Sequence, residues 1–216
     1  MVTPGSYFIP ARSIWMEQEI KRSRFIATIG HVRGREEAQQ FIIKAQEQWP
    51  GANHYCSAFV AGDPATTMDI GMSDGGEPQG TAGRPILNVL RHSGIGEVAA
   101  VVIRYFGGIR LGTGGLVRAY AGSVQKVLEE LPLDKFIPSK RVRFVLPYAD
   151  EDALRRLLNI QGFALEDICY THEVEIYACL PCSDVPAFYK EVCDRFRGRV
   201  RLMNGSESAL SADKPE

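Results

Sequence analysis

The sequence predicts an α+β protein of two domains, and three observations support that prediction. Strand-like and helix-like segments alternate over residues 13–131, and residues 141–203 carry a complete strand–helix–strand–strand–helix–strand pattern. Between them lies PLDKFIPSK (132–140), whose prolines and charged residues are typical of a domain boundary. We therefore expect a first domain over 1–135, a second over 138–205 and a disordered polar tail over 206–216.

The first domain is predicted to open with two strands and then to mix helices with strands. SIWMEQEIKRSRFIATIGHV (13–32) predicts two strands joined at the charged KRSR turn. The other elements follow in chain order: a helix in EEAQQFIIKAQEQW (36–49), a strand in NHYCSAFVAG (53–62), a Gly/Asp/Pro-rich loop over 62–80, a short helix in 82–94 stopped by Gly94, a buried strand in EVAAVVIRYF (97–106), and a helix with Thr113 as its N-cap that ends before Pro132.

The second domain is predicted to have the ferredoxin-like arrangement of two split βαβ units. Its elements are a strand in RVRFVLPY (141–148), a helix in DEDALRRLLNI (150–160), strands in FALEDICYT (163–171) and EVEIYACL (173–180), a helix in SDVPAFYKEVCDRF (183–196) capped by Ser183, and a strand in RVRLM (199–203).

Composition points to a globular protein of the cytoplasm. Of the 216 residues, 45% are apolar and 24% are charged, which is ordinary for a soluble domain protein. The start, MVTPGSYFIPARS, lacks the layout of a signal peptide, and no apolar run reaches the ~18 residues of a membrane span, so we expect no membrane partner. Five cysteines, an odd number, fit a reduced compartment better than a disulfide framework.

The spacing of Cys179 and Cys182 resembles half of a zinc site, with Cys169 and His172 as the other half. If both halves lie on one hairpin, His172 is at the turn and Cys179 is seven residues along an extended strand. That separation is roughly 20 Å or more, too long for shared coordination. We therefore expect no bound metal, and no motif in the chain calls for a cofactor.

The net charge of −1 conceals a segregation of charge along the first domain. Residues 61–77 contain four acids and no base, whereas residues 78–128 contain six bases and the single acid Glu97. A local field can be strong where the total charge is near zero. The second stretch is therefore a candidate surface for an anionic partner.

Within that stretch, RYFGGIRLGTGGLVRAY (104–120) combines a glycine-rich turn with arginines. Glycines permit positive φ, and the amides at a helix start attract phosphate, but the pattern matches neither a Walker sequence nor GxGxxG. A tight strand-to-helix turn alone would explain the glycines but not the arginines. The candidate phosphate-binding residues are Arg84, Arg104, Arg110 and Arg118 with Gly107, Gly108, Gly112, Thr113, Gly114 and Gly115.

Catalytic alternatives rest on fewer residues. Asp74 and Glu77 lie on the acidic loop, where paired carboxylates could act as acid and base or hold Mg²⁺, although such loops are more often solvated turns. His54 and Cys56 point to one face of a strand, but no third group orients them as a nucleophilic pair.

Four segments resemble the IMPACT/YigZ family: SDGGEPQGTAGRPIL (73–87), VVIRYFGGIRLGTGGLVRAY (101–120), IKRSRFIA (20–27) and HYCSAF (54–59). The resemblance implies that the first domain has the fold of the second domain of a small-subunit ribosomal protein, which RNA-binding translation proteins and some small-molecule kinases share. It implies that the second domain is similar to the ferredoxin-like domains of elongation factor G. Eukaryotic relatives regulate translation through an initiation-factor kinase, a role that depends on an additional N-terminal domain, and we do not expect it here.

We therefore expect a translation-associated regulatory protein that binds RNA, the ribosome or a translation factor through its arginine and glycine surface. An enzyme acting on a phosphorylated or nucleotide substrate, using Asp74 or Glu77, is the alternative, and a protein–protein docking module is a further one.

Overall fold

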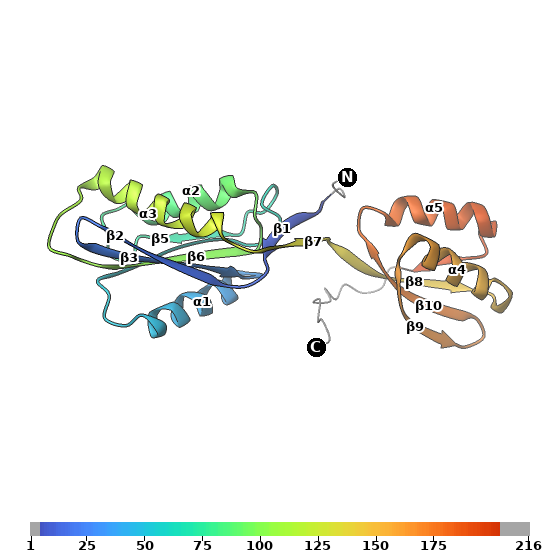
Figure 1. Cartoon of the computed structure of the whole chain (residues 1–216). Helices are drawn as coiled ribbons and strands as arrows, with labels where there is room; N and C mark the ends of the chain where they lie inside the picture. The colour runs from blue at the N-terminus through green and yellow to red at the C-terminus, as the bar shows by residue number, and fades with distance from the viewer. Residues whose placement is uncertain (1–4, 204–216) are drawn as a thin grey trace. The chain divides into compact units, whose positions relative to one another are not determined.

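The structure, a computed structural model, describes residues 5–203 and contains two compact units (Figure 1). The first unit is Tyr7–Phe136, and the second begins at Ile137. The tail expected over 206–216 lies outside the described residues. Helices and antiparallel sheets make up both units, so the protein is a two-domain α+β protein.

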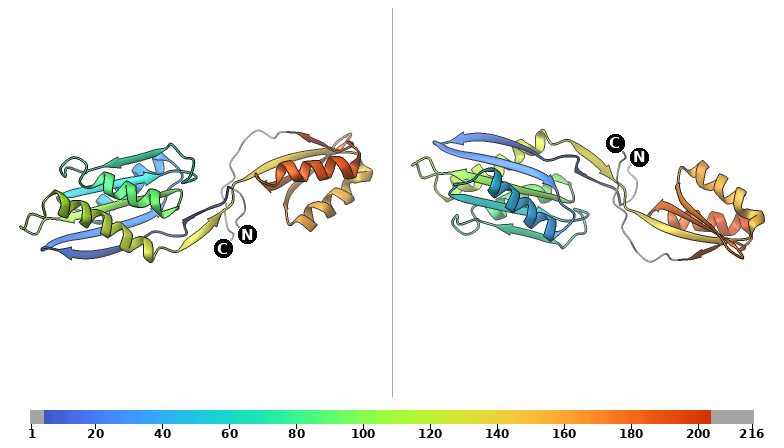
Figure 2. Two further views of the ribbon diagram at one scale, coloured as in Figure 1. Left: turned by 90° about the horizontal axis from the view of Figure 1, so that it is seen from above. Right: turned by 90° about the horizontal axis from the view of Figure 1, so that it is seen from below.

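The first unit is built on one antiparallel sheet with the strand order β2-β3-β6-β4-β5. Its strands are β2 (Ile14–Ile20), β3 (Ser23–His31), β4 (His54–Val60), β5 (Ile70–Ser73) and β6 (Val98–Tyr105). Helices α2 (Gly83–Ser93) and α3 (Thr113–Glu129) cover one face of the sheet, and α1 (Arg35–Gln48) lies on the other (Figures 1 and 2). The sheet is therefore the middle of three layers.

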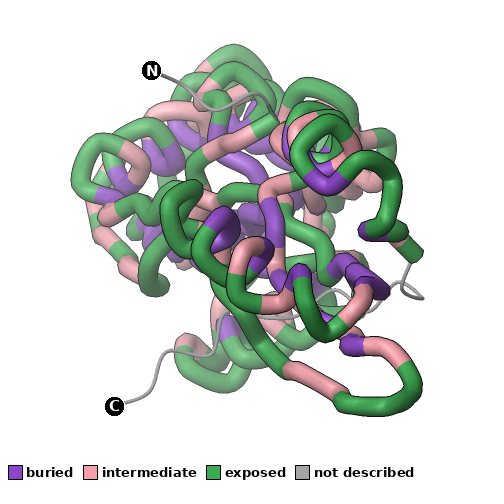
Figure 3. The backbone as a smooth tube through the Cα atoms, turned by 90° about the vertical axis from the view of Figure 1, so that its right-hand side faces the viewer, coloured by how far each residue is buried: buried purple, intermediate pink, exposed green. Residues whose placement is uncertain are grey.

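The central strand β6 is apolar at successive positions because both of its faces are covered. Val98, Ala100 and Val102 pack in the core beneath α2 and α3, whereas Val101 and Ile103 face α1. Each helix buries one side and exposes the other, so buried and exposed stretches alternate along the helical turns (Figure 3).

Two helix ends show the conformational freedom of glycine. Gly94 ends α2 with a φ of 70°, the left-handed conformation expected at this position. The N-cap of α3 is Gly112, with a φ of 74°, and its carbonyl accepts the Leu116 N–H. The prediction that Thr113 is the N-cap is wrong by one residue, because the chain turns into the helix through a positive φ that threonine disfavours.

Three short strands of the first unit were not predicted. Strand β5 lies within the segment expected to be a loop, and β7 (Leu133–Phe136) occupies the expected linker. Strand β7 pairs antiparallel with β1 (Tyr7–Pro10), and the Tyr7 and Phe136 rings lie 5.0 Å apart. Because β1 and β7 pair across nearly the whole first unit, neither leaves a local pattern to detect.

The second unit is a four-stranded antiparallel sheet with the order β11-β8-β10-β9 and two helices. Its elements are β8 (Ser139–Leu146), a short 3₁₀ turn (Tyr148–Asp150), α4 (Glu151–Gln161), β9 (Ala164–Tyr170), β10 (Val174–Pro181), α5 (Val185–Phe196) and β11 (Arg201–Met203). This is the ferredoxin-like arrangement. The N-cap of α5 is Asp184 rather than Ser183, whose hydroxyl instead donates to the Asp184 carboxylate.

The second unit has a core of its own. Val174, Ile176 and Ala178 alternate with more exposed residues along β10, and these three pack with buried side chains of α4 and α5. None of the helices among residues 5–203 is long and apolar enough to cross a membrane.

Because its core is self-contained, we expect the fragment 138–205 to fold alone. Thermal unfolding of the expressed fragment, followed by circular dichroism, should give one cooperative transition. A gradual, non-cooperative melt would contradict this expectation.

Candidate functional site

The glycine-rich loop over residues 106–112 joins β6 to α3 and is held against the β2–β3 turn. A Cβ atom on Gly107 would overlap the carbonyl oxygen of Arg22, so only glycine fits at this close approach. The Gly107 N–H also donates to the Ser23 Oγ at 3.2 Å. The loop and the turn therefore form one local structure at this end of the sheet.

The β2–β3 turn itself consists of two basic residues in an unusual conformation. Lys21 has a φ of 48° and Arg22 a φ of 64°, values that hairpin turns of this kind usually assign to Asn and Gly. A side chain in this region costs on the order of 1 kcal/mol. The turn thus tolerates strain while presenting two cations, which the sequence reasoning did not select although the KRSR turn marks them.

The start of α3 leaves backbone amides without partners. The first N–H groups of a helix have no carbonyl within the helix to bond to, and no side chain caps α3. Gly114 and Gly115 occupy its first turn, and a Cβ on Gly114 would meet only open space. The positive end of the helix dipole is therefore accessible to an anion.

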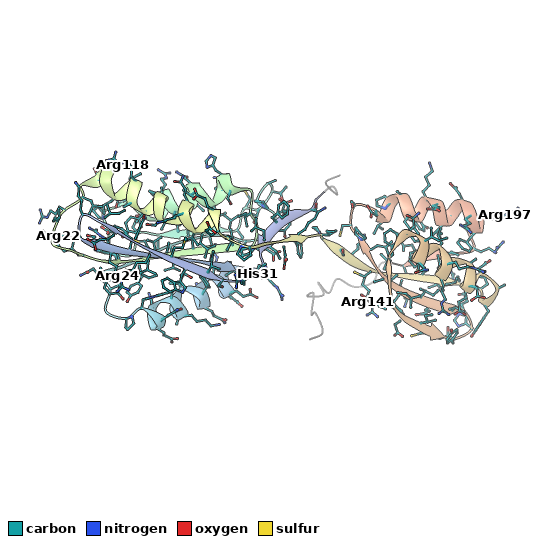
Figure 4. All side chains as sticks on the ribbon, in the orientation of Figure 1. Arg22, Arg24, His31, Arg118, Arg141 and Arg197 are labelled. Atoms are coloured by element: carbon teal, nitrogen blue, oxygen red, sulfur yellow. The ribbon has the colours of Figure 1, made fainter. Side chains whose placement is uncertain are left out.

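Four exposed cations surround this helix start: Lys21, Arg22, Arg110 and Arg118, named here the cationic end. Lys21, Gly115 and Arg118 line a shared cavity of about 210 Å³ together with apolar side chains. Figure 4 shows Arg22 and Arg118 at the same end of the first unit. Among residues 5–203, no acidic side chain forms a salt bridge with any of the four.

The other two predicted arginines occupy different environments. Arg84 is exposed in the first turn of α2. The prediction that Arg104 lines the binding surface is wrong. Arg104 is only 4% exposed, and its Nη1 donates to Glu77 Oε1 at 2.6 Å. Its guanidinium also lies over the Phe25 and Phe106 rings, 5.4 and 5.5 Å from their centroids.

Glu77 is the acceptor at the centre of a buried polar cluster. Besides Arg104, the Tyr120 hydroxyl of α3 donates to Glu77 Oε1 at 2.7 Å. Burial, with Cys56 and Glu77 nearby, raises the pKa of Tyr120 and keeps its proton in place for this bond. The carboxylate of Glu77 is thus committed to holding the structure together rather than open to a substrate.

Asp74 has an equally structural environment. Its carboxylate accepts the backbone N–H groups of Gly80, Ala82 and Gly83 at 2.8, 3.0 and 2.8 Å, which anchors the loop at the start of α2. Burial by itself raises the pKa of Asp74, but the three hydrogen bonds outweigh it and leave the pKa below its ordinary value. The catalytic role considered for Asp74 would require it to release these bonds.

The side chains of His54 and Cys56 are also engaged in structural hydrogen bonds. Cys56 is fully buried, and its thiol donates to the Asp74 carbonyl at 2.9 Å. Burial raises the pKa of this thiol to about 12, so it is not a thiolate near neutral pH. His54 Nδ1 donates to the Gly75 carbonyl at 3.1 Å.

In the second unit, the β9–β10 pairing places Cys169 opposite Glu175 but Cys179 opposite Ala164. The two cysteines therefore occupy well-separated positions on the hairpin. Over residues 5–203, no three side chains of His, Cys, Asp or Glu gather as a metal site would require.

We expect Asp74→Asn to lower the free energy of unfolding by about 1–2 kcal/mol at neutral pH, because charged hydrogen-bond acceptors are lost. The pKa of Asp74 is depressed in the folded state, so its contribution is complete above the ordinary carboxyl pKa and is lost as pH falls through the folded value. Urea unfolding across acidic pH should therefore show less acid dependence in the variant. Parallel pH profiles for the two proteins would refute this account.

Comparison with known proteins identifies both units. The Impact N-terminal domain family matches residues 21–128, and the domain of unknown function DUF1949 matches residues 144–199. A solved structure described as a hypothetical protein shares 38% identity, with a TM-score of 0.69 over 94% of this chain and 99% of that one.

Curated relatives match nearly the whole chain. IMPACT family member YigZ of Escherichia coli is 39% identical over 198 residues, covering 92% of this chain and 97% of its own. An IMPACT family member of Haemophilus influenzae is 40% identical over 91% of this chain and 95% of its own. YvyE of Bacillus subtilis is 36% identical over 95% of this chain and 94% of its own. Two domain matches in order and relatives along almost the full length establish that this protein belongs to the IMPACT family.

Proposed function

We propose that the protein binds the phosphate backbone of RNA through the cationic end, as part of a translation-associated regulatory role. The observation that carries this proposal is the gathering of four exposed cations around the open start of α3, none of them in a salt bridge with an acid of residues 5–203. Guanidinium groups and helix-start amides both bind phosphate oxygens. Several spaced cations suit a backbone that carries repeated charge better than they suit a single phosphate.

The distribution of charge supports a local rather than a general attraction. The chain has a net charge of −1, so no uniform positive field surrounds it. Arg104, the cation that could have spread the site inward, is neutralised by Glu77. The binding surface proposed here is therefore the cationic end, with Arg84 as an exposed cation on the neighbouring helix start.

The alternative of an enzyme acting on a phosphorylated or nucleotide substrate, with Asp74 or Glu77 in its site, needs a free carboxylate to hold Mg²⁺ or to accept a proton. Asp74 is bonded to three backbone amides, and Glu77 to Arg104 and Tyr120. These bonds favour the binding proposal over the enzymatic one.

We expect Arg110→Ala and Arg118→Ala each to weaken RNA binding to a similar degree for unrelated sequences, because phosphate contacts carry no sequence information. Each variant should also reduce the slope of log affinity against log salt by ~0.7, the value for one lost contact to a single strand. Fluorescence anisotropy of labelled RNA at several salt concentrations measures both quantities.

Arg91→Ala is the matched control, since Arg91 is exposed in the same unit but lies in the last turn of α2. It should leave both affinity and slope unchanged. Absence of RNA binding by the wild type at low salt, combined with Mg²⁺-dependent binding of ATP, would favour the enzyme instead.

The strained β2–β3 turn gives a separate prediction. Replacing Lys21 and Arg22 by Asn and Gly should raise the free energy of unfolding, on the order of 1 kcal/mol, because both residues suit a positive φ. The same double variant should bind RNA more weakly. Urea unfolding and RNA titration of one preparation test the two effects together, and a variant that is more stable with unchanged affinity would remove the turn from the site.

A further inference from the structure

A second concave surface of the first unit lies on the opposite face of the sheet from α2 and α3. This groove of about 460 Å³ runs between α1 and the β2–β3 hairpin. The side chains lining it that matter here are Ser13, Thr28, Gln40, Lys44, Gln48 and Trp49. None of them takes part in the cationic end.

The groove exists because α1 covers only part of its face of the sheet. Ala38 packs with residues of β4 and β6, and Ala45 packs with residues of β3 and β6, whereas no residue of β2 joins either cluster. Helix α1 itself therefore leaves the outer strand β2 uncovered on this face. Trp15 pairs with Thr28 in the β2–β3 register, so it borders the groove, next to the residues that line it.

Trp15 is held in place although it is 53% exposed. Its ring meets the Trp49 ring edge-on, with centroids 5.8 Å apart and planes at 68°. An edge contact fixes the orientation of an indole while leaving much of its surface in solvent. A fixed, half-exposed aromatic ring is the feature on which proteins stack unpaired nucleic-acid bases.

The polar lining of the groove favours a base over an apolar helix or peptide. Gln40 and Gln48 each offer an amide donor and acceptor, Ser13 and Thr28 offer hydroxyls, and Lys44 offers a cation. Glu37, the acid in the lining, accepts the Arg33 backbone N–H at 2.8 Å. Mixed donors and acceptors beside an aromatic ring match the edge and the face of a nucleobase.

Arg24 lies on the groove's face of the sheet, close in the chain to the β2–β3 turn that carries Lys21 and Arg22 of the cationic end. Arg24 alternates in phase with Thr28 along β3, four residues away, which corresponds to ~13 Å on a strand. Its guanidinium lies 5.3 Å from the centroid of the Tyr105 ring, and its bonds to Glu17 neutralise the acid beside Trp15. Figure 4 shows Arg24 near the cationic end and His31, which also lines the groove, at the other end of β3.

We propose that the groove binds an unpaired base of single-stranded RNA, stacked on Trp15, while the strand's backbone runs past Arg24 to the cationic end. This inference rests on the proposed function and specifies its ligand as single-stranded. A duplex keeps its base faces stacked inside, so it can satisfy the cationic end but not the groove.

Intrinsic fluorescence tests the proposal directly, because Trp15 and Trp49 are the two tryptophans of the chain. A short oligouridine should quench the emission of the wild-type protein, and a duplex RNA should not. Trp15→Ala should weaken oligouridine binding roughly tenfold, the loss of one base stack, and Trp15→Phe should retain most of the affinity. The salt slope of Trp15→Ala should equal that of the wild type, unlike the slope of Arg118→Ala.

Tyr170→Ala is the matched control, since Tyr170 is a 58% exposed aromatic residue in the second unit. Circular dichroism establishes whether Trp15→Ala folds; if it does not, quenching of the wild type and the affinity of Trp15→Phe decide. Salt-dependent RNA binding without quenching, or equal affinity of Trp15→Ala and the wild type, would overturn this inference and leave the proposed function standing. Equal quenching by duplex would also overturn it, and absence of RNA binding to the wild type would overturn both.

Discussion

The buried contact between Arg104 and Glu77 fixes the geometry on which the cationic surface depends. It joins the central strand β6 to the loop after β5, and the Tyr120 hydroxyl brings α3 to the same carboxylate. Leaving one buried charge without its partner lowers the free energy of unfolding by about 3–5 kcal/mol. Separation of these three elements would therefore strongly destabilise the first unit. This cluster fixes α3 against the sheet, and the packing of Gly107 against the β2–β3 turn fixes the loop that leads into the helix start.

The glycines of the β6–α3 loop have different physical reasons, and only some concern a ligand. Gly107 is required because the chain passes against the Arg22 carbonyl. Gly108 and Gly112 have positive φ values of 85° and 74°. Gly114 has neither constraint, and its bare backbone lies at the accessible helix start. The segment is therefore both a tight turn and a candidate phosphate cradle, and the two readings do not exclude each other.

Periodicity in the sequence predicted the long strands, the helices and the two-domain organisation, because those elements bury one face along many residues. It missed β1, β5 and β7, which are only four residues long, and β1 and β7 also pair with each other across nearly the whole first unit. It placed Arg104 correctly at the end of a buried strand but could not supply Glu77 as its partner, 27 residues earlier. The sequence marked Lys21 and Arg22 as part of a turn but did not place them in the site. Their turn comes close to the glycine loop only because β3 pairs with β6.

The pairing of Tyr7–Pro10 with Leu133–Phe136 has a consequence for how the protein is made. A ribosome releases the chain from its N-terminus, so the first strand emerges long before its partner does. During that interval β1 has an unpaired edge, and the Tyr7 ring lacks its Phe136 neighbour. The last step in completing the first unit therefore waits until nearly all of its residues have been synthesised, when the second unit has just begun to emerge.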